Sequence, residues 1–173
     1  MKTGFTMLAS AAALLPAAQA QAQAFERYSS PATPAGPALI LQGAKVKAGS
    51  DILYLSGQLA SPIDPSKPMR PGMTMADYGD TKTQTISTLN KIKTILASKG
   101  YAMSDIFKMT LFVAADPKLG KMDFAGVNEG FKQFFGTAEN PNTVARSAIQ
   151  VAALAGPNFL IEIEAIAAKT PGK

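Results

Sequence analysis

The fold is decided near the carboxyl end, where residues 144–151 read VARSAIQV and residues 161–167 read IEIEAIA. Both stretches alternate with the two-residue period of β-strands and contain β-branched residues. Between them, the run AGPN at residues 155–158 has the composition of a turn. The two stretches are therefore predicted to form a hairpin, which would bring Arg146 near the glutamates of the second stretch.

Arg146 needs a charged partner if its strand is buried. Removing a guanidinium group from water is costly unless a carboxylate or another anion faces it. Two interpretations follow: a structural ion pair on one face of the sheet, or a pocket that holds a fixed cation beside a general base. Glu162 and Glu164 have the same strand parity, so the alternation alone does not choose between them.

The composition excludes several classes of chemistry. The chain has no Cys and no His, which rules out Cys/His and Ser/His nucleophiles and zinc sites built from thiolates or imidazoles. It has no GxGxxG or GxxxxGKS/T pattern that would indicate a nucleotide. We therefore expect neither a cofactor nor a metal ion, and any reaction must use Arg, Lys, carboxylates, hydroxyl groups, backbone amides and water.

A secretory signal peptide is predicted over residues 1–24. Lys2 precedes an uncharged stretch rich in Ala and Leu, and AQAQAQA at residues 18–24 offers overlapping A-x-A cleavage sites. The expected cleavage points follow Ala20, Ala22 or Ala24.

The remaining residues, 25–173, are predicted to form a single domain in a bacterial periplasm or outside the cell. Pro16 and the Ala/Gln composition of the leader give too little hydrophobic free energy for a stable membrane span, so no membrane association is expected after cleavage. The formal net charge of the full chain is +5. Four lysines among the predicted helical residues read as a solvated helix face: Lys82, Lys91, Lys93 and Lys99. Because no basic cluster is interleaved with aromatic residues, no nucleic-acid partner is expected.

Apolar spacing and turn residues predict the other elements. They are an irregular segment at residues 26–35, strands at 39–46 and 51–56, a Pro-rich irregular segment at 61–72, a helix over 81–99, a strand at 107–113, and a helix that begins at Phe124 and ends at Gly136. With the final hairpin, the order is β-β-α-β-α-β-β. This order predicts an α+β domain in which helices cover one face of a mixed sheet.

Local signals support two of these elements. Thr81 and Gln84 have capping-box spacing at the start of the first helix, and Gly100 stands where this helix is expected to stop. In the third strand, alternate positions are apolar and are predicted to share one face: Phe107, Met109, Leu111 and Val113.

Several motifs give the chain a family resemblance. In addition to ARS at residues 145–147 and IEIEAIA, they are Gly36-Pro37, YLSGQ at 54–58, DIFKMTLFV at 105–113 and VNEGF at 127–131. On these motifs the chain resembles the RidA family, also called YjgF/YER057c/UK114, of reactive enamine and imine deaminases. The similarity covers about residues 30–169.

The resemblance implies a chorismate-mutase-like protomer that assembles as a homotrimer with clefts between subunits. A physical argument agrees in part, because a sheet with helices on one side leaves its other face to be covered, and a closed oligomer can cover it. The implied substrate is a small carboxylate.

Site residues are carried over from the family one by one. Arg146 takes the position of the substrate-carboxylate clamp, for which a planar guanidinium is suited, and Glu162 that of the catalytic carboxylate that orients the attacking water. Asn128 matches a site-lining Asn, and the backbone of Gly57 lies in the matching cleft segment. Ala148 stands where Cys is common and can still offer its backbone N–H.

A second departure from the family pattern is Ala38, which follows Gly36-Pro37 where many members have Tyr. The aromatic hydroxyl expected at the mouth of the pocket is therefore missing. Neither Tyr54 nor Tyr101 can be assumed to replace it.

The implied activity is hydrolysis of a C–N bond: a small 2-imino or enamino acid becomes a 2-keto acid and ammonia. Two alternatives stay open, because the enzymes that generate such enamines are usually cytoplasmic whereas this chain has an export signal. One is a non-catalytic protein that binds small carboxylates or acts as a holdase. The other is an endoribonuclease, which the absence of His makes less favourable because His is the commonest general acid–base at neutral pH.

Overall fold

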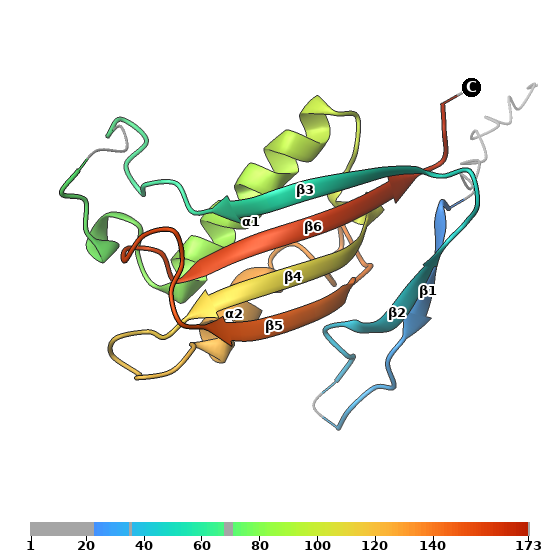
Figure 1. The fold of residues 1–173 in the computed structure, drawn as a ribbon. Coiled ribbons are helices and arrows are strands. Elements are labelled where there is room, and N and C mark those ends of the chain that lie inside the picture. Colours follow the sequence, from blue (N-terminus) through green and yellow to red (C-terminus); the bar gives the residue numbers. More distant parts are fainter. Residues whose placement is uncertain (1–22, 35, 68–70, 173) are drawn as a thin grey trace, which may run out of the picture.

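One mixed β-sheet organises the molecule. The computed structural model describes residues 23–34, 36–67 and 71–172. Within them, six strands lie in the spatial order β1-β2-β5-β4-β6-β3, and two α-helices pack behind the sheet (Figure 1). In chain order the elements are β1 (Phe25–Ser29), β2 (Leu41–Val46), β3 (Asp51–Leu59), α1 (Thr81–Ser98), β4 (Ile106–Ala114), α2 (Phe124–Phe131), β5 (Ala145–Val151) and β6 (Ile161–Lys169), with short 3-10 helices at Met75–Asp77 and Met103–Asp105. The predicted α+β class, with helices on one face of a mixed sheet, is confirmed.

The amino-terminal region differs from the prediction. The segment 26–35 was expected to be irregular, but β1 pairs with β2 in antiparallel register from Phe25↔Val46 onward. Phe25 is buried and its ring lies 5.5 Å from that of Phe107, so this strand is anchored on the sheet by an aromatic contact. The predicted signal peptide, residues 1–24, lies outside the described residues except for its last two.

The predicted carboxyl-terminal hairpin is wrong. β5 runs parallel to β4, whereas β6 pairs with β4 and β3 in antiparallel register, so β4 lies between the two strands. The connection of residues 152–160 is long enough to pass the end of β4, where the Ala114 amide donates to the Leu160 carbonyl at 3.0 Å. Turn chemistry in the connection shows that the chain reverses but does not show which strand becomes its neighbour.

The core lies between the sheet and the helices. Fully buried side chains of α1 and α2 pack on alternate residues of β4 and β6: Leu89, Ile92, Leu96, Val127, Phe131, Met109, Leu111, Val113, Ile161 and Ile163. Phe107 does not share the face of Met109 as predicted. The pairing register of β4 shifts between Ile106 and Lys108, and Phe107 packs instead with Phe25.

The start of α1 also differs from the predicted capping box. Asp80 is the N-cap and accepts a hydrogen bond from the Thr83 amide at 2.8 Å. Gln84 is buried with no exposed surface and bonds to distant loops instead of capping the helix. The predicted stop at Gly100 agrees with the structure, since the helix ends at Ser98 and Gly100 has a left-handed φ of +74°.

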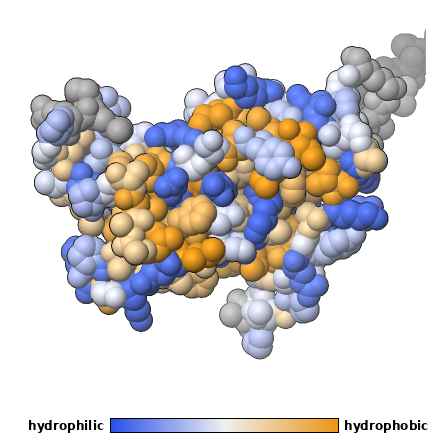
Figure 2. Space-filling model, viewed as in Figure 1, coloured by the Kyte–Doolittle hydropathy of each residue, from blue (hydrophilic) through white to orange (hydrophobic). Residues whose placement is uncertain are grey.

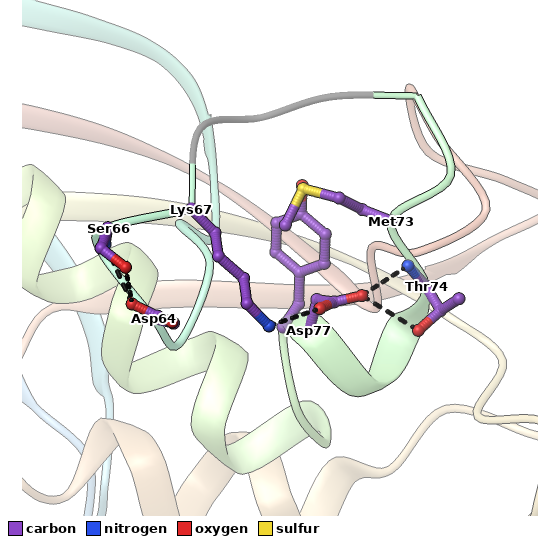
Figure 3. Close-up of polar contacts among 7 residues, drawn as sticks. Asp64, Ser66, Lys67, Met73, Thr74 and Asp77 are labelled. Carbon is purple, nitrogen blue, oxygen red and sulfur yellow. Dashed lines mark hydrogen bonds and ion pairs between the residues drawn. The ribbon is translucent and has the colours of Figure 1, made fainter.

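The long segment between β3 and α1 has no strand or α-helix in its described residues, as the prolines predicted. Carboxylates organise it (Figure 3). Asp64 accepts from the amide and hydroxyl of Ser66 at 3.0 and 2.7 Å, and these bonds lower its pKa. Asp77 accepts from the amide and hydroxyl of Thr74 at 2.9 and 3.1 Å and lies 3.7 Å from the Lys67 ammonium group. The segment is thus shaped by local polar contacts.

No helix or strand of the described residues covers the face of the sheet opposite the helices. Figure 2 views this face and shows apolar surface lying among polar groups. Tyr54 is 71% exposed and Ile149 is 48% exposed. Among the residues that the structure describes, no helix combines the length and apolar character that crossing a bilayer requires.

Candidate functional site

Arg146 forms the first half of the candidate site, on the helix side of the sheet. It stands beside Met109 in the ladder between β5 and β4, and its side chain extends toward α2. Its Nη2 donates to Oδ1 of Asn128 at 2.6 Å, and its guanidinium carbon lies 4.4 Å from the centre of the Phe131 ring. A second ring, that of Phe124, is 5.8 Å away and half-exposed. One amide and two aromatic rings therefore fix the plane of the guanidinium group.

Among the described residues, no carboxylate pairs with the Arg146 guanidinium group. Burial lowers its pKa to about 10, so the group is still a cation at neutral pH. Within the described residues, the ion pairs are Lys67–Asp77 and Lys82–Glu129, and neither involves Arg146. Nη1 of Arg146 is buried and has no protein acceptor. The structural ion pair with Glu162 or Glu164, one of the two interpretations of the sequence, is thus absent within the protomer, and one buried N–H donor of Arg146 is left without an acceptor.

Glu162 and Gly57 form the second half, on the opposite side of the sheet. Glu162 lies between Ile161 and Ile163, which are both fully buried beneath the helices, so its side chain projects from the other face. Its register partners are Phe112 on β4 and Leu59 on β3. The carboxylate of Glu162 lies over the backbone of Gly57, in the space that a Cβ at that position would occupy. Only glycine leaves room for this arrangement without movement.

The two halves are not brought together within one chain. Arg146 and Asn128 lie on the helix side, whereas Glu162 and Gly57 lie on the open side, and β4 separates β5 from β6. The prediction that the hairpin would place Arg146 near the glutamates is therefore wrong for a single protomer. Glu164 shares the face of Glu162, as the strand parity predicted, and is exposed opposite Thr110.

The outer edge of β5 is available to a ligand beside Arg146. β2 meets β5 at one register pair, Leu41↔Ala145, and no further pair between these strands occurs in the described residues. The backbone from Arg146 onward, including Ala148, therefore has one edge without a neighbouring strand. Ala148 is two residues from Arg146 on the same face and packs against the core.

The tyrosines do not supply an obvious replacement for the hydroxyl missing at Ala38. Tyr54 lies on the open face beside Ile166 and is largely exposed. The Tyr101 hydroxyl donates to the Asp51 carbonyl at 3.4 Å. In the described part of the chain, no group of three carboxylates, imidazoles or thiolates is placed to hold a metal ion.

Sequence reasoning missed two features of the site. No contact between Phe131 and Arg146 was predicted, although the position of Phe131 three residues after Asn128 on one helix face could have indicated that both residues contact Arg146. Lys91 was placed on a solvated face, but its ammonium group donates to the Leu59 carbonyl at 2.7 Å and burial lowers its pKa. Nothing in the local sequence signals that contact, because Leu59 is far away along the chain.

Comparisons with known proteins agree on one family. The family described as Endoribonuclease L-PSP matches residues 42–169. A 2-iminobutanoate/2-iminopropanoate deaminase of Salmonella typhimurium is 37% identical over 141 residues, which are 80% of this chain and 95% of that protein. The structure of E. coli TdcF with bound serine has a TM-score of 0.52 and 33% identity, and the match covers 86% of this chain and 96% of that one. The structure of the E. coli YjgF gene product has a TM-score of 0.51 and 33% identity, covering 82% and 97%.

Proposed function

We propose a deaminase activity for this chain, which belongs to the RidA family, also described as the YjgF/YER057c/UK114 or endoribonuclease L-PSP family. The proposed reaction hydrolyses a small 2-imino or enamino acid to a 2-keto acid and ammonia. The observation that carries the proposal is the buried Arg146 guanidinium group, which has no carboxylate partner and an unused buried N–H donor. A substrate carboxylate would supply the missing anion.

The second part of the proposal is a homotrimer that completes the site. Arg146 and Glu162 lie on opposite faces of one sheet, so a site that uses both needs a second copy of the chain. The exposed open face, with Tyr54 and Ile149, offers surface for such an assembly. In a closed ring of identical subunits, the Arg146 half of one protomer meets the Glu162 half of the next.

The proposed chemistry needs only the chain's own side chains and water. Arg146 holds the substrate carboxylate, with its plane fixed by Asn128 and Phe131. Glu162 accepts a proton from a water molecule as the water adds to the imine carbon. The nitrogen then takes up a proton and leaves as ammonia, while the carbon keeps the oxygen of the water as the ketone. The imine is already electrophilic, so positioning of the two reactants supplies much of the rate.

Mixed trimers give the sharpest test. Arg146→Ala and Glu162→Gln chains are each expected to be inactive when alone, with enamines generated in situ and 2-keto acid formation as the readout. Co-expressed in equal amounts, they should recover about a quarter of the wild-type rate, because about one site in four pairs two intact halves. No recovery in verified mixed trimers would contradict the shared site. A monomer mass by light scattering would contradict it independently.

The alternatives are outcomes of the same assay. A leaderless wild-type protein that binds 2-keto acids but forms no product above the solution rate would be a carboxylate-binding protein. Cleavage of a single-stranded RNA that Glu162→Gln abolishes would favour the endoribonuclease.

We further propose that residues 1–24 are a signal peptide and that the domain works outside the cytoplasm of a bacterium. The basis is the sequence of this segment, with one early lysine and repeated A-x-A sites. Protein from a periplasmic fraction should begin between Gln21 and Phe25 by intact mass. Retention of Met1 in that fraction would contradict cleavage.

A further inference from the structure

Three polar side chains on one stripe of α1 reach out of the helix and bond to loop and strand-end backbone. They are Gln84, Ser87 and Lys91, spaced at i, i+3 and i+7, so they lie on the same side of the helix. We call them the polar stripe of α1. Their partners come from two segments that are distant in sequence: the residues after β3 and those before β6.

Gln84 bonds to the chain that leads into β6. Its Oε1 accepts from the Leu160 amide at 2.9 Å, and its Nε2 donates to the Asn158 carbonyl at 3.0 Å. The same Nε2 donates to the Gly79 carbonyl at 3.0 Å. Gln84 has no exposed surface, so these bonds are made away from water. One buried amide thus ties the start of β6 to the start of α1.

Ser87 and Lys91 bond to the chain that leaves β3. The Ser87 hydroxyl accepts from the Ser61 amide at 2.9 Å and donates to the Ser61 carbonyl at 3.3 Å. The Lys91 ammonium group donates to the Leu59 carbonyl at 2.7 Å. Lys91 forms none of the ion pairs found in the described residues. It is therefore held by a single carbonyl contact at the end of β3.

These two segments are the ones that carry the Glu162 half of the site. Gly57 precedes Leu59 by two residues, and Glu162 follows Leu160 by two residues. Leu59 and Glu162 are themselves register partners across β3 and β6. A shift of either strand end would therefore move the Glu162 carboxylate relative to the Gly57 backbone. The side-chain partners of Arg146 belong to α2 and are not among the groups that the stripe bonds.

We propose that the polar stripe of α1 positions the Glu162 carboxylate for proton transfer, with Gln84 as its principal positioning residue. This inference rests on the proposed function for its kinetic consequence. Gln84 touches no reacting atom in this scheme and acts through the backbone that it holds. A misplacement of about 1 Å in a catalytic group can cost about 100-fold in rate. The stripe therefore affects turnover and not carboxylate binding.

The stripe is a costly way to stabilise a helix, which favours a positioning role. Apolar side chains of similar size could pack at these sites without the desolvation of an amide and an ammonium group. Burial lowers the pKa of Lys91 with no opposing charge, which shows that its charged form is penalised there. Polar contacts are directional, however, and hold two strand ends at defined distances in a way that apolar packing does not.

The test compares Gln84→Met with two variants of neighbouring buried residues of α1. Methionine keeps the length of the side chain and removes all three hydrogen bonds. Thr88→Val is the isosteric control, because the Thr88 hydroxyl is buried without a partner. Leu89→Ala is the stability control, because Leu89 lies in the core and its truncation lowers Tm. Neither control removes a hydrogen bond to the two segments.

If the wild-type protein turns over its substrate, Gln84→Met should lower kcat by about 10- to 100-fold, while KM and 2-keto acid affinity stay within about twofold of wild type. Thr88→Val should match wild type, and Leu89→Ala should lower Tm without lowering kcat below the melting range. If kcat of Gln84→Met falls no further than that of Leu89→Ala, the positioning role is overturned. If Gln84→Met does not fold, Lys91→Met is the second variant, and an unchanged kcat would equally overturn the proposal.

A second readout does not depend on turnover. NMR of labelled glutamate carboxyl groups follows the carboxyl chemical shift of Glu162, whose signal is identified by its loss in Glu162→Gln. This chemical shift should change in Gln84→Met and stay unchanged in Thr88→Val and Leu89→Ala. An unchanged chemical shift in Gln84→Met refutes positioning even in an active enzyme. A changed chemical shift in a protein whose wild type forms no product leaves positioning supported and the deaminase proposal refuted.

Discussion

The two halves of the candidate site are built in different ways. Arg146 lies near the start of β5, and Asn128 and Phe131 from α2 hold it by direct side-chain contacts. Glu162 sits near the start of β6, over the Gly57 backbone, and the segments on either side are held by α1. The cation is thus fixed by its immediate neighbours, whereas the carboxylate is fixed by backbone that is itself held from a distance. Binding and proton transfer should therefore respond to different substitutions.

The largest expected effect comes from Glu162→Gln. The amide is nearly isosteric but cannot accept a proton from water, so kcat should fall by about 100- to 10,000-fold. Affinity for a 2-keto acid should change little, because the Arg146 half is intact. Glu164→Gln is the matched control on the same face of β6. Equal loss in both variants would mean that the face as a whole, and not Glu162, carries the reaction.

Gly57→Ala should break the Glu162 half without removing a charge. The new Cβ would overlap the Glu162 carboxylate, which must move. We expect kcat to fall by about 100-fold, with keto acid affinity retained. Gly43→Ala is the control, because a Cβ there would meet its nearest neighbour at 3.8 Å, an ordinary contact. Wild-type kcat in Gly57→Ala would show that the position of the carboxylate is not critical.

Arg146→Lys should break the other half. An ammonium group keeps the charge but loses the planar pair of donors, so keto acid affinity should fall by about 10- to 100-fold. The fold should survive, which circular dichroism and Tm can verify. A large fall in Tm with unchanged affinity would show that Arg146 serves structure alone.

Asn128→Asp should separate stability from binding within the Arg146 half. A carboxylate at the acceptor position would pair with the guanidinium group, which now has only a neutral oxygen there at 2.6 Å. Keto acid affinity should fall by about tenfold, while Tm stays the same or rises because the buried cation gains a counter-charge. Isothermal titration and thermal melts measure the two effects. If the keto acid affinity is unchanged, the ligand does not bind at the edge of the guanidinium group that Asn128 contacts.

The smallest effect is expected from pH. Burial lowers the folded-state pKa of Arg146 to about 10, well below its ordinary value, so the cation persists throughout the neutral range. Keto acid affinity at the Arg146 half should be constant from about pH 6 to 9 and weaken above about pH 10 as the proton is lost. In that upper range the unfolded chain binds more protons at this residue, so its contribution to the free energy of unfolding rises with pH. Affinity that changes tenfold between about pH 6 and 8 would implicate another titrating group.

Local sequence determined the elements and the chemistry. Alternation predicted the strands at β4, β5 and β6, and the 3.6-residue period predicted α1 and α2, because these patterns depend on which side of an element is buried. The family motifs identified Arg146, Asn128, Gly57, Ala148 and Glu162 as site positions, whose roles remain predictions. The absence of Cys and His is enough by itself to restrict the possible chemistry, because it depends on composition and not on the fold.

Tertiary structure decided which elements became neighbours. The hairpin prediction failed because turn residues such as Gly156 and Pro157 mark a reversal of the chain and contain no information about its partner strand. The neighbour was set by β4, whose Met109, Leu111 and Val113 are buried at the centre of the sheet. As a result, β5 and β6 lie on either side of β4.

The same distinction explains the candidate site. A single residue type can show that a group needs a partner, as the burial of Arg146 does, but the partner lies wherever the sheet order and the strand parity place it. Those two properties put Arg146 and Glu162 on opposite faces of the sheet. Tertiary packing likewise explains why Gln84, predicted as a capping residue, is instead buried and bonded to Asn158 and Leu160. The free energy of packing between segments distant in sequence comes from many weak contacts, and no short stretch of sequence specifies all of them.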